Sequence, residues 1–221
     1  YDEILPNRKI KKEDKENKQV VSPMSLVITG FAPVINIHKT ITPELTNQNS
    51  ILYRLDLSGG QYRLGGSILA QTLSQLGDDC PDVDNADDLI AFFNLIQNAN
   101  EQDLICAYHD VSYGGLIATV AEMQFSARVD IDLVLAKDKL IEQLFSEEIG
   151  AVVQVLPEKQ AEFLALAKTL NADKFLSKIG VVKETVIGGG NVDDLTIFVV
   201  KDIQNPIDTE ETTYRFKRAD L

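Results

Sequence analysis

The stretch CAYHDVSYGGLIATVAEM, Cys106–Met123, decides the expected fold because it joins a strand, a turn and a helix without a break. Its first residues continue the apolar run LICAY, Leu104–Tyr108, which predicts a buried strand. The paired glycines Gly114 and Gly115 then predict a tight turn. Beyond them, apolar residues recur at helical spacing in one stripe formed by Leu116, Val120 and Met123. We therefore expect a strand that carries polar side chains at its end, followed by a glycine turn and an amphipathic helix.

Outward from this stretch, strands and helices alternate along the chain. Runs rich in β-branched or alternating apolar residues predict strands over residues 20–28, 32–37, 51–57, 129–135, 151–156, 175–182 and 195–200. Helical spacing and capping residues predict helices over residues 67–76, 84–98, 137–145 and 157–170, the second of them capped by Asp84. This alternation, with some adjacent strands, predicts an α+β sandwich in which helices cover a mixed sheet.

The two ends of the chain differ in composition from its middle. Residues 1–19 include a mixed-charge run without apolar periodicity, which predicts a surface linker. Residues 20–203 carry the alternating pattern and are expected to form one domain. Inside it, GGGN at Gly188–Asn191 is interpreted as a hairpin-like loop. Residues 204–221 are interpreted as the start of a second linker, and its TEETTYRFKRADL segment as the beginning of a helix.

Composition argues against several classes of partner. A formal charge of −13 over 221 residues repels polyphosphate backbones, so no nucleic acid partner is expected. No run reaches the roughly 18 apolar residues of a membrane span, and the charged first residues do not resemble a secretory leader. Cys80 and Cys106 lack metal-ligand spacing and suit free thiols in a reducing compartment. We therefore expect a cytoplasmic protein that binds phosphate only locally, through backbone amides or a metal ion.

Candidate binding residues gather where the apolar run ends. Asp110 is a hard oxygen ligand of the kind that Mg²⁺ prefers, because this ion takes one or two protein carboxylates and completes its shell with phosphate oxygens and water. Ser112 and the amides near Gly114 and Gly115 are candidates to hold phosphate at a helix N-terminus. The alternative is that Asp110 or Ser112 only caps the following helix. His109 is interpreted as a hydrogen-bonded turn residue rather than a general base.

Two further features have both a binding and a structural interpretation. The glycine loop SGGQYRLGGS, residues 58–67, follows a strand and precedes a helix, yet its spacing matches no phosphate-binding motif, so a packing turn is an equal alternative. The adjacent pair Glu147 and Glu148 is a possible carboxylate site, although a solvated turn is the favoured interpretation because neighbouring side chains diverge. No arrangement of residues indicates a catalytic nucleophile.

Four segments together resemble a known family. HDVSYGGLIATVAEMQF, SPMSLVITGF, LGGSILAQTLSQLGD and LFSEEIGAVVQV are similar to segments of the large, single-chain form of phosphoribosylformylglycinamidine synthase. The resemblance runs from about Val20 to about Val200 in the same order. It corresponds to the second of two family domains that are similar to the C-terminal half of aminoimidazole ribonucleotide synthetase. It implies that fold for this chain, and it implies that residues 204–221 lead toward a glutaminase domain outside the sequence.

The resemblance also implies an activity and a site. Family members use ATP and glutamine to convert formylglycinamide ribonucleotide to formylglycinamidine ribonucleotide in purine biosynthesis, so the parent protein is expected to be a ligase with a glutamine amidotransferase part. This domain is similar to the one that holds the auxiliary Mg–nucleotide, ATP or ADP. It implies a Mg²⁺ ligand at Asp110 and a nucleotide contact at Ser112, with no catalytic residue. The remaining domains are the implied partners, and the piece alone is expected to be inactive.

The sequence departs from the family at one position of this motif. The family usually has an acidic residue where this chain has Tyr113. If that acid only shapes the turn, little changes, whereas nucleotide binding weakens if it supports the metal shell. A different class of function stays open beside the ligase: a non-catalytic nucleotide-binding scaffold or interface domain of another ATP-dependent enzyme.

Overall fold

The structure is a computed structural model that describes residues 27–34, 36–136, 138–184, 196–202 and 214–217. The chain divides into two units, residues 1–35 and 36–221. In the first unit, the described residues 27–34 form neither helix nor strand, and in the second, Ile37–Lys39 is a 3₁₀ helix, η1. The predicted strand over residues 32–37 is therefore wrong. Pro33 lies inside that range, and proline disfavours a strand because it has no N–H to donate to a strand ladder. Most of the predicted strand over 20–28 lies outside the described residues.

One mixed sheet organises the second unit. Its seven strands follow the order β2-β4-β1-β5-β3-β6-β7. The pairs β2–β4, β4–β1, β1–β5 and β5–β3 are antiparallel. Strands β3 and β6 pair parallel, and β6 and β7 pair antiparallel. The strands are β1 (Ser50–Asp56), β2 (Ala107–Asp110), β3 (Asp130–Leu135), β4 (Gly150–Val155), β5 (Leu176–Lys183), β6 (Thr196–Asp202) and β7 (Tyr214–Lys217). The α+β class and the mixed sheet are confirmed.

The last strands correct two predictions about the end of the chain. Because β3 lies between β5 and β6, the segment that joins those two strands does not form a hairpin between neighbours. Gly188–Asn191 itself lies outside the described residues. The tail does not begin a helix where it is described, since Tyr214–Lys217 is strand β7. Its sequence YRFK alternates aromatic and basic residues, which is the period of a strand.

Five α-helices complete the described part of the second unit. They are α1 (Ile68–Thr72), α2 (Ala86–Glu101), α3 (Gly115–Ala127), α4 (Leu140–Phe145) and α5 (Gln160–Thr169), with short 3₁₀ helices η2 (Pro157–Lys159) before α5 and η3 (Asp173–Phe175) after it. Each predicted helix is present, but α1 is shorter than expected. The predicted cap of α2 is wrong by one residue, because the Asn85 side chain accepts the N–H of Asp87. Among the described residues, no helix has both the length and the apolarity to cross a membrane.

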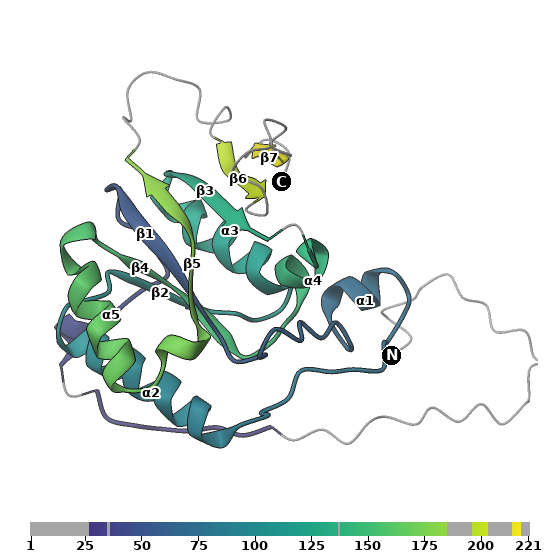
Figure 1. The fold of residues 1–221 in the computed structure, drawn as a ribbon, viewed down its shortest axis with the longest axis horizontal. Helices are drawn as coiled ribbons and strands as arrows, with labels where there is room; N and C mark the ends of the chain where they lie inside the picture. Colours follow the sequence, from purple (N-terminus) through teal and green to yellow (C-terminus); the bar gives the residue numbers. More distant parts are fainter. Residues whose placement is uncertain (1–26, 35, 137, 185–195, 203–213, 218–221) are drawn as a thin grey trace, which may run out of the picture. The chain divides into compact units, whose positions relative to one another are not determined.

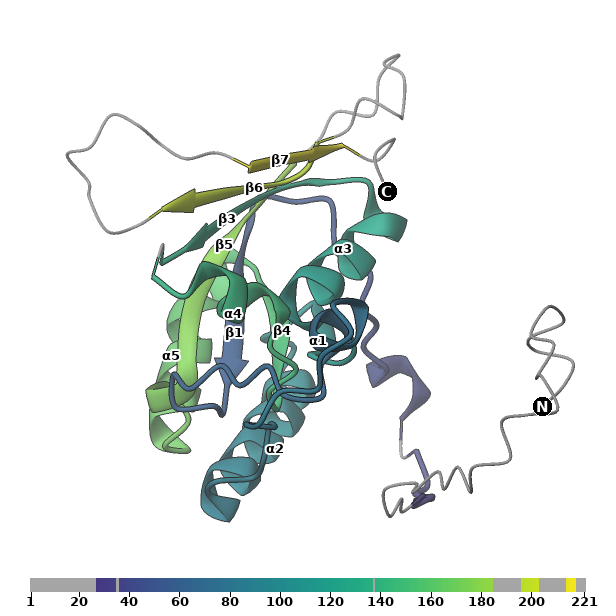
Figure 2. The ribbon, with the colours of Figure 1, turned by 90° about the vertical axis from the view of Figure 1, so that its right-hand side faces the viewer.

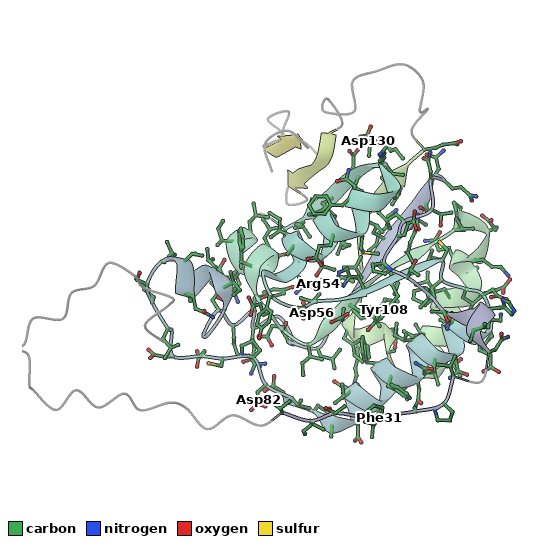
Figure 3. The ribbon with its side chains drawn as sticks, turned by 180° about the vertical axis from the view of Figure 1, so that it is seen from behind. Phe31, Arg54, Asp56, Asp82, Tyr108 and Asp130 are labelled. Carbon is green, nitrogen blue, oxygen red and sulfur yellow. The ribbon has the colours of Figure 1, made fainter. Side chains whose placement is uncertain are left out.

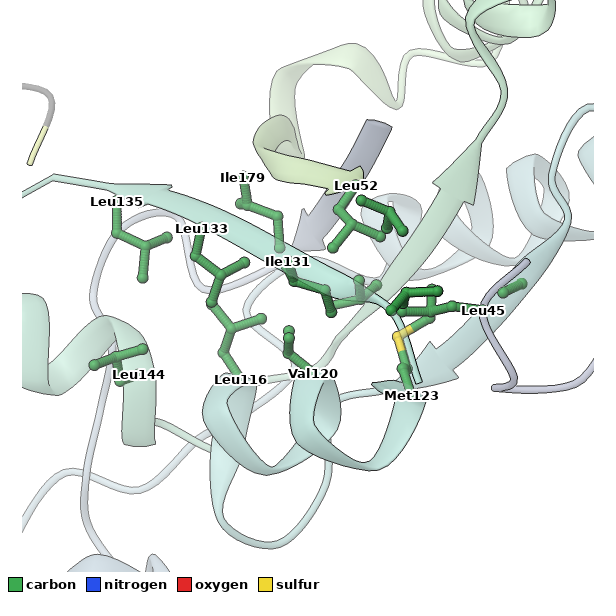
Figure 4. Packing of buried hydrophobic residues seen from close by; sticks show 14 residues of the cluster. Leu45, Leu52, Leu116, Val120, Met123, Ile131, Leu133, Leu135, Leu144 and Ile179 are labelled. Carbon is green, nitrogen blue, oxygen red and sulfur yellow. The ribbon is translucent and has the colours of Figure 1, made fainter. Parts of the chain in front are cut away.

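Helices cover both faces of the sheet (Figures 1 and 2). Helices α3 and α4 pack on one face, where the stripe Leu116, Val120 and Met123 meets Ile131 and Leu133 of β3 (Figure 4). Helices α2 and α5 pack on the other face, against the side chains of β1 and β4 that point the opposite way. Burial of one such side chain contributes about 1.5–3 kcal/mol. The stripe in the opening stretch therefore fixes α3, and with it the turn at its N-terminus.

Candidate functional site

The candidate site begins at the end of an edge strand. Strand β2 pairs only with β4 in the described sheet, and Asp110 lies opposite Ala151 at the last ladder position. The Asp110 carboxylate is 68% exposed, and its Oδ1 lies 3.7 Å from His109 Nδ1. Within the part of the chain that the structure describes, no hydrogen bond holds this carboxylate. Strand pairing thus fixes the Asp110 backbone while its side chain stays available to a ligand.

The turn between β2 and α3 excludes the capping alternative. Helix α3 begins at Gly115, its N-cap is Gly114 in the left-handed conformation, and no side chain caps it. Asp110 and Ser112 are therefore not helix caps. Ser112 and Tyr113 are exposed, the latter by 78%, so the tyrosine that replaces the usual acid is directed to solvent. Asp110 ends β2 and Ser112 follows two residues later, so both predicted ligand residues lie where the strand passes into this turn.

The glycine amides of the turn already have partners. The Gly114 N–H donates to Glu147 Oε1 at 2.9 Å, and the Gly115 N–H donates to the Ser112 carbonyl at 3.0 Å. These two glycine amides are therefore not free for phosphate in this structure. The Ser112 hydroxyl and a metal ion remain as candidates to hold phosphate at the turn.

The pair Glu147 and Glu148 is not the solvated turn that the sequence favours. The Glu148 side chain is 1% exposed and forms a two-pronged ion pair with Arg63, with Nε–Oε1 and Nη2–Oε2 distances of 2.8 Å. Glu148 also accepts the backbone N–H of Arg63. Hydrogen bonding to Glu148 is the main reason that the pKa of Arg63 is raised, with Asp84 adding to it. The two side chains do diverge, since Glu147 accepts the N–H of Ile68 on the other side.

His109 is hydrogen-bonded, as the sequence predicts, but it lies in strand β2 rather than in a turn. Its Nε2 lies 2.7 Å from Glu122 Oε2, which joins β2 to α3 beside the turn. Burial raises the pKa of the neighbouring Tyr108, and the charge of Asp110 raises it further. Asp110 therefore acts electrostatically on the strand that carries it.

An apolar groove lies next to the turn, between α1 and α3. It has a volume of about 460 Å³. The residues that line it are mostly aliphatic or aromatic: Ile68, Leu69, Thr72, Gly114, Ile117, Ala118, Ala121, Glu122, Phe125 and Phe145. Sequence reasoning missed this groove because its walls come from separate segments. The site therefore offers a polar turn and an apolar surface that share Gly114.

A second polar cluster, also missed from the sequence, supports α4. Arg54 is 3% exposed, lies 3.3 Å from Asp56 and donates to the Gln143 carbonyl at 3.1 Å (Figure 3). Its guanidinium lies 5.3 Å from the centre of the Tyr62 ring, and burial of that ring is the main cause of a raised Tyr62 pKa. One signal in the sequence could have indicated that Arg54 is buried: side chains alternate along β1, so Arg54 falls on the same face as the buried Leu52.

The metal-binding capacity of the described residues is limited. They contain no group of three or more histidine, cysteine, aspartate or glutamate residues placed to hold an ion. Asp110 supplies one exposed carboxylate, which fits Mg²⁺ only where phosphate oxygens, water or another part of the protein complete the shell. The turn thus fits a metal ion that arrives with a nucleotide better than it fits a permanently bound ion.

The fold agrees with comparisons to known proteins. Residues 57–192, more than half of the chain, match the family described as AIR synthase related protein, C-terminal domain. The chain therefore belongs to this family. It is also 43% identical, over 178 residues, to the phosphoribosylformylglycinamidine synthase of Schizosaccharomyces pombe. The resemblance noted from the sequence is thereby confirmed. The match covers 77% of this chain but 13% of that relative, so the chain spans a small part of the relative's length.

Solved structures support the same fold at low identity. The PurL protein of T. maritima, complexed with ATP, is similar with a TM-score of 0.57 and 12% identity, over 82% of this chain and 27% of that one. The same protein complexed with FGAR gives a TM-score of 0.51 at 15% identity, over 75% of this chain and 27% of that one. The hydrogenase maturation protein HypE in complex with ATP gives 0.52 at 14% identity, over 76% and 52%. At these identities the likeness concerns the fold alone.

Proposed function

We propose that this chain is a domain of a phosphoribosylformylglycinamidine synthase and contributes an auxiliary Mg–nucleotide site to it. Asp110 would hold the Mg²⁺, and Ser112 would contact the phosphates of ATP or ADP. The observation that carries the proposal is the exposed Asp110 carboxylate, which no hydrogen bond holds in the described structure, on the same turn as Ser112. The relative from S. pombe supports the identity of the parent enzyme.

The electrostatics of the turn favour a metal-bound nucleotide over free phosphate. The chain has a formal charge of −13, and Glu122 and Glu147 lie beside the turn. Phosphate brought here alone would meet carboxylates, whereas a divalent cation reverses the sign of the local field. The N-terminus of α3 adds a favourable dipole for the bound anion.

The groove next to the turn suits the rest of a nucleotide. Its walls are mostly apolar, as expected of a surface on which a base packs, and it meets the turn at Gly114. A ligand with a flat apolar end and a charged end would use both parts. Likeness to HypE and to PurL, each solved with ATP, supports this assignment through the fold only.

In this proposal the chemistry occurs with other domains. The parent enzyme uses ATP to activate the formyl-amide oxygen of formylglycinamide ribonucleotide, and ammonia released from glutamine then displaces phosphate. This chain supplies no catalytic residue and neither of its cysteines is the glutaminase nucleophile. The remaining domains are its partners, supply the other Mg²⁺ ligands and share its cytoplasmic location.

A phosphate-release assay tests the proposed function. The intact protein should release phosphate from ATP only when both formylglycinamide ribonucleotide and an ammonia source are present, and the 221-residue chain alone should release none. An intact protein that has no such activity would overturn the assignment to this reaction. Activity of the isolated chain would overturn the auxiliary role.

A further inference from the structure

Glu147 connects the two glycine turns that border the groove. Its Oε1 accepts the Gly114 N–H at 2.9 Å and the Ile68 N–H at 2.8 Å. These amides lie at the N-termini of α3 and α1, and they are 33 and 79 residues from Glu147 in the sequence. A single carboxylate oxygen therefore joins two segments that the chain brings together only by folding.

The backbone on both sides of Glu147 is fixed. On one side, the end of α4 packs so closely on the turn that a Cβ at Gly115 would lie 2.7 Å from the Leu144 carbonyl oxygen. On the other side, the buried Glu148 is held by its ion pair with Arg63. The Glu147 carboxylate is thus presented to Gly114 and Ile68 from a segment that is itself anchored.

The Glu147 contact matters for the turn because, among the described hydrogen bonds of the turn, it is the one made to an ionised side chain. Gly114 and Gly115 have positive φ angles of 85° and 73°, and α3 has no side-chain cap. Besides the Glu147 contact, the Val111 N–H donates to the Gly150 carbonyl at 2.9 Å and the Gly115 N–H donates to the Ser112 carbonyl at 3.0 Å. Thr119 Oγ1 donates to the Gly115 carbonyl at 3.1 Å and to the Asp110 carbonyl at 3.4 Å. Hydrogen bonds to an ionised acceptor are stronger than neutral ones.

We propose that Glu147 is a positioning residue, which fixes the turn of Asp110 and Ser112 against α1 and so sets the geometry of the nucleotide site. This role rests on the proposed function of the turn. Glu147 touches neither the metal nor the phosphates, since its carboxylate accepts the Gly114 and Ile68 amides, while Asp110 holds the metal and Ser112 the phosphates. Its side chain also keeps the two walls of the groove, α1 and α3, in register.

The contact itself is tested by NMR on the ¹⁵N-labelled 221-residue chain. Both amides should be protected from hydrogen exchange, and in Glu147→Ala the amide shifts of Gly114 and Ile68 should change together while their exchange becomes faster. Glu147→Gln keeps an acceptor oxygen, so both amides should stay protected. Amides that are unchanged in Glu147→Ala, or of which only one responds, would overturn the contact.

The positioning role is tested by calorimetric titration of Mg–ADP into the intact protein. Glu147→Ala should weaken binding by about tenfold, because a hydrogen bond to a charged group is lost, and Glu147→Gln should bind within about twofold of the unchanged protein since it keeps the acceptor. Glu162→Gln is the matched control, because Glu162 is an exposed carboxylate on α5, across the sheet. Unchanged affinity in Glu147→Ala would overturn the positioning role. An intact protein that binds no Mg–ADP would overturn the proposed function, and the positioning role with it, while the NMR result on the contact still stands.

Discussion

Replacement of Gly115 by alanine should destabilise the domain by more than backbone strain alone. Gly115 has a φ of 73°, and a left-handed conformation costs a residue with a Cβ about 1–2 kcal/mol. In addition, the new Cβ would lie 2.7 Å from Leu144 O, 2.7 Å from Phe145 C and 2.8 Å from Ser146 O. These are backbone atoms at the end of α4 and cannot rotate away, so overpacking adds about 1–3 kcal/mol. The expected loss is therefore about 2–5 kcal/mol in the free energy of unfolding.

Urea unfolding of the 221-residue chain measures this loss. Gly60→Ala is the matched control, because Gly60 has a φ of 83° but a Cβ there would meet nothing within 4 Å. It should lose only the strain of about 1–2 kcal/mol. If Gly115→Ala and Gly60→Ala lost the same stability at equal m-values, the tight contact between α4 and the turn would be refuted, and with it the reason that Glu147 reaches Gly114.

Three further outcomes follow from buried groups. Glu148→Ala leaves the Arg63 guanidinium without its buried partner and should cost about 3–5 kcal/mol in urea unfolding; a loss below 1 kcal/mol, roughly the worth of an exposed pair, would contradict the burial. Burial raises the pKa of the Cys106 thiol, so at pH 8 iodoacetamide should modify the exposed Cys80 first, as peptide mass spectrometry can follow, and equal rates would be inconsistent with the structure. Burial, followed by the charge of Asp56, raises the pKa of Tyr62 above its ordinary 10.0. The neutral phenol therefore contributes stability that is fully present below pH 10.0 and is lost as the pH rises through the folded pKa, so Tyr62→Phe should reduce the alkaline loss of stability, and an unchanged profile would argue against it.

Local patterns predicted the parts of the fold that depend on a short stretch of sequence. The stripe Leu116, Val120 and Met123 predicted α3 and its buried face, and these side chains are fully buried. The paired glycines predicted the turn. The end of the apolar run LICAY predicted that Asp110 would lie at the end of a strand. These features depend on periodicity and turn chemistry within one segment, which the sequence shows directly.

Features that depend on distant segments could not be predicted in this way. The order β5-β3-β6 brings strands together across long separations, so nearness in sequence wrongly indicated a hairpin between β5 and β6. Glu147 and Glu148 looked solvated because charged pairs usually are, while their partners Ile68 and Arg63 lie far away in sequence. The Gly114 amide was expected to be free for phosphate because its partner, Glu147, is also distant in sequence. Only the folded chain shows that the Glu147 carboxylate accepts this amide.

Calorimetric titration of ADP into the intact protein, with and without Mg²⁺, tests whether Asp110 binds a nucleotide-associated Mg²⁺. Binding should require Mg²⁺, and Asp110→Asn should weaken it by roughly tenfold or more, since a charged ligand is lost. Glu158→Gln removes an exposed carboxylate from η2, before α5, and should leave binding unchanged. If Asp110→Asn bound Mg–ADP as tightly as Glu158→Gln, or if binding did not depend on Mg²⁺, Asp110 would not be a ligand of a nucleotide-associated Mg²⁺.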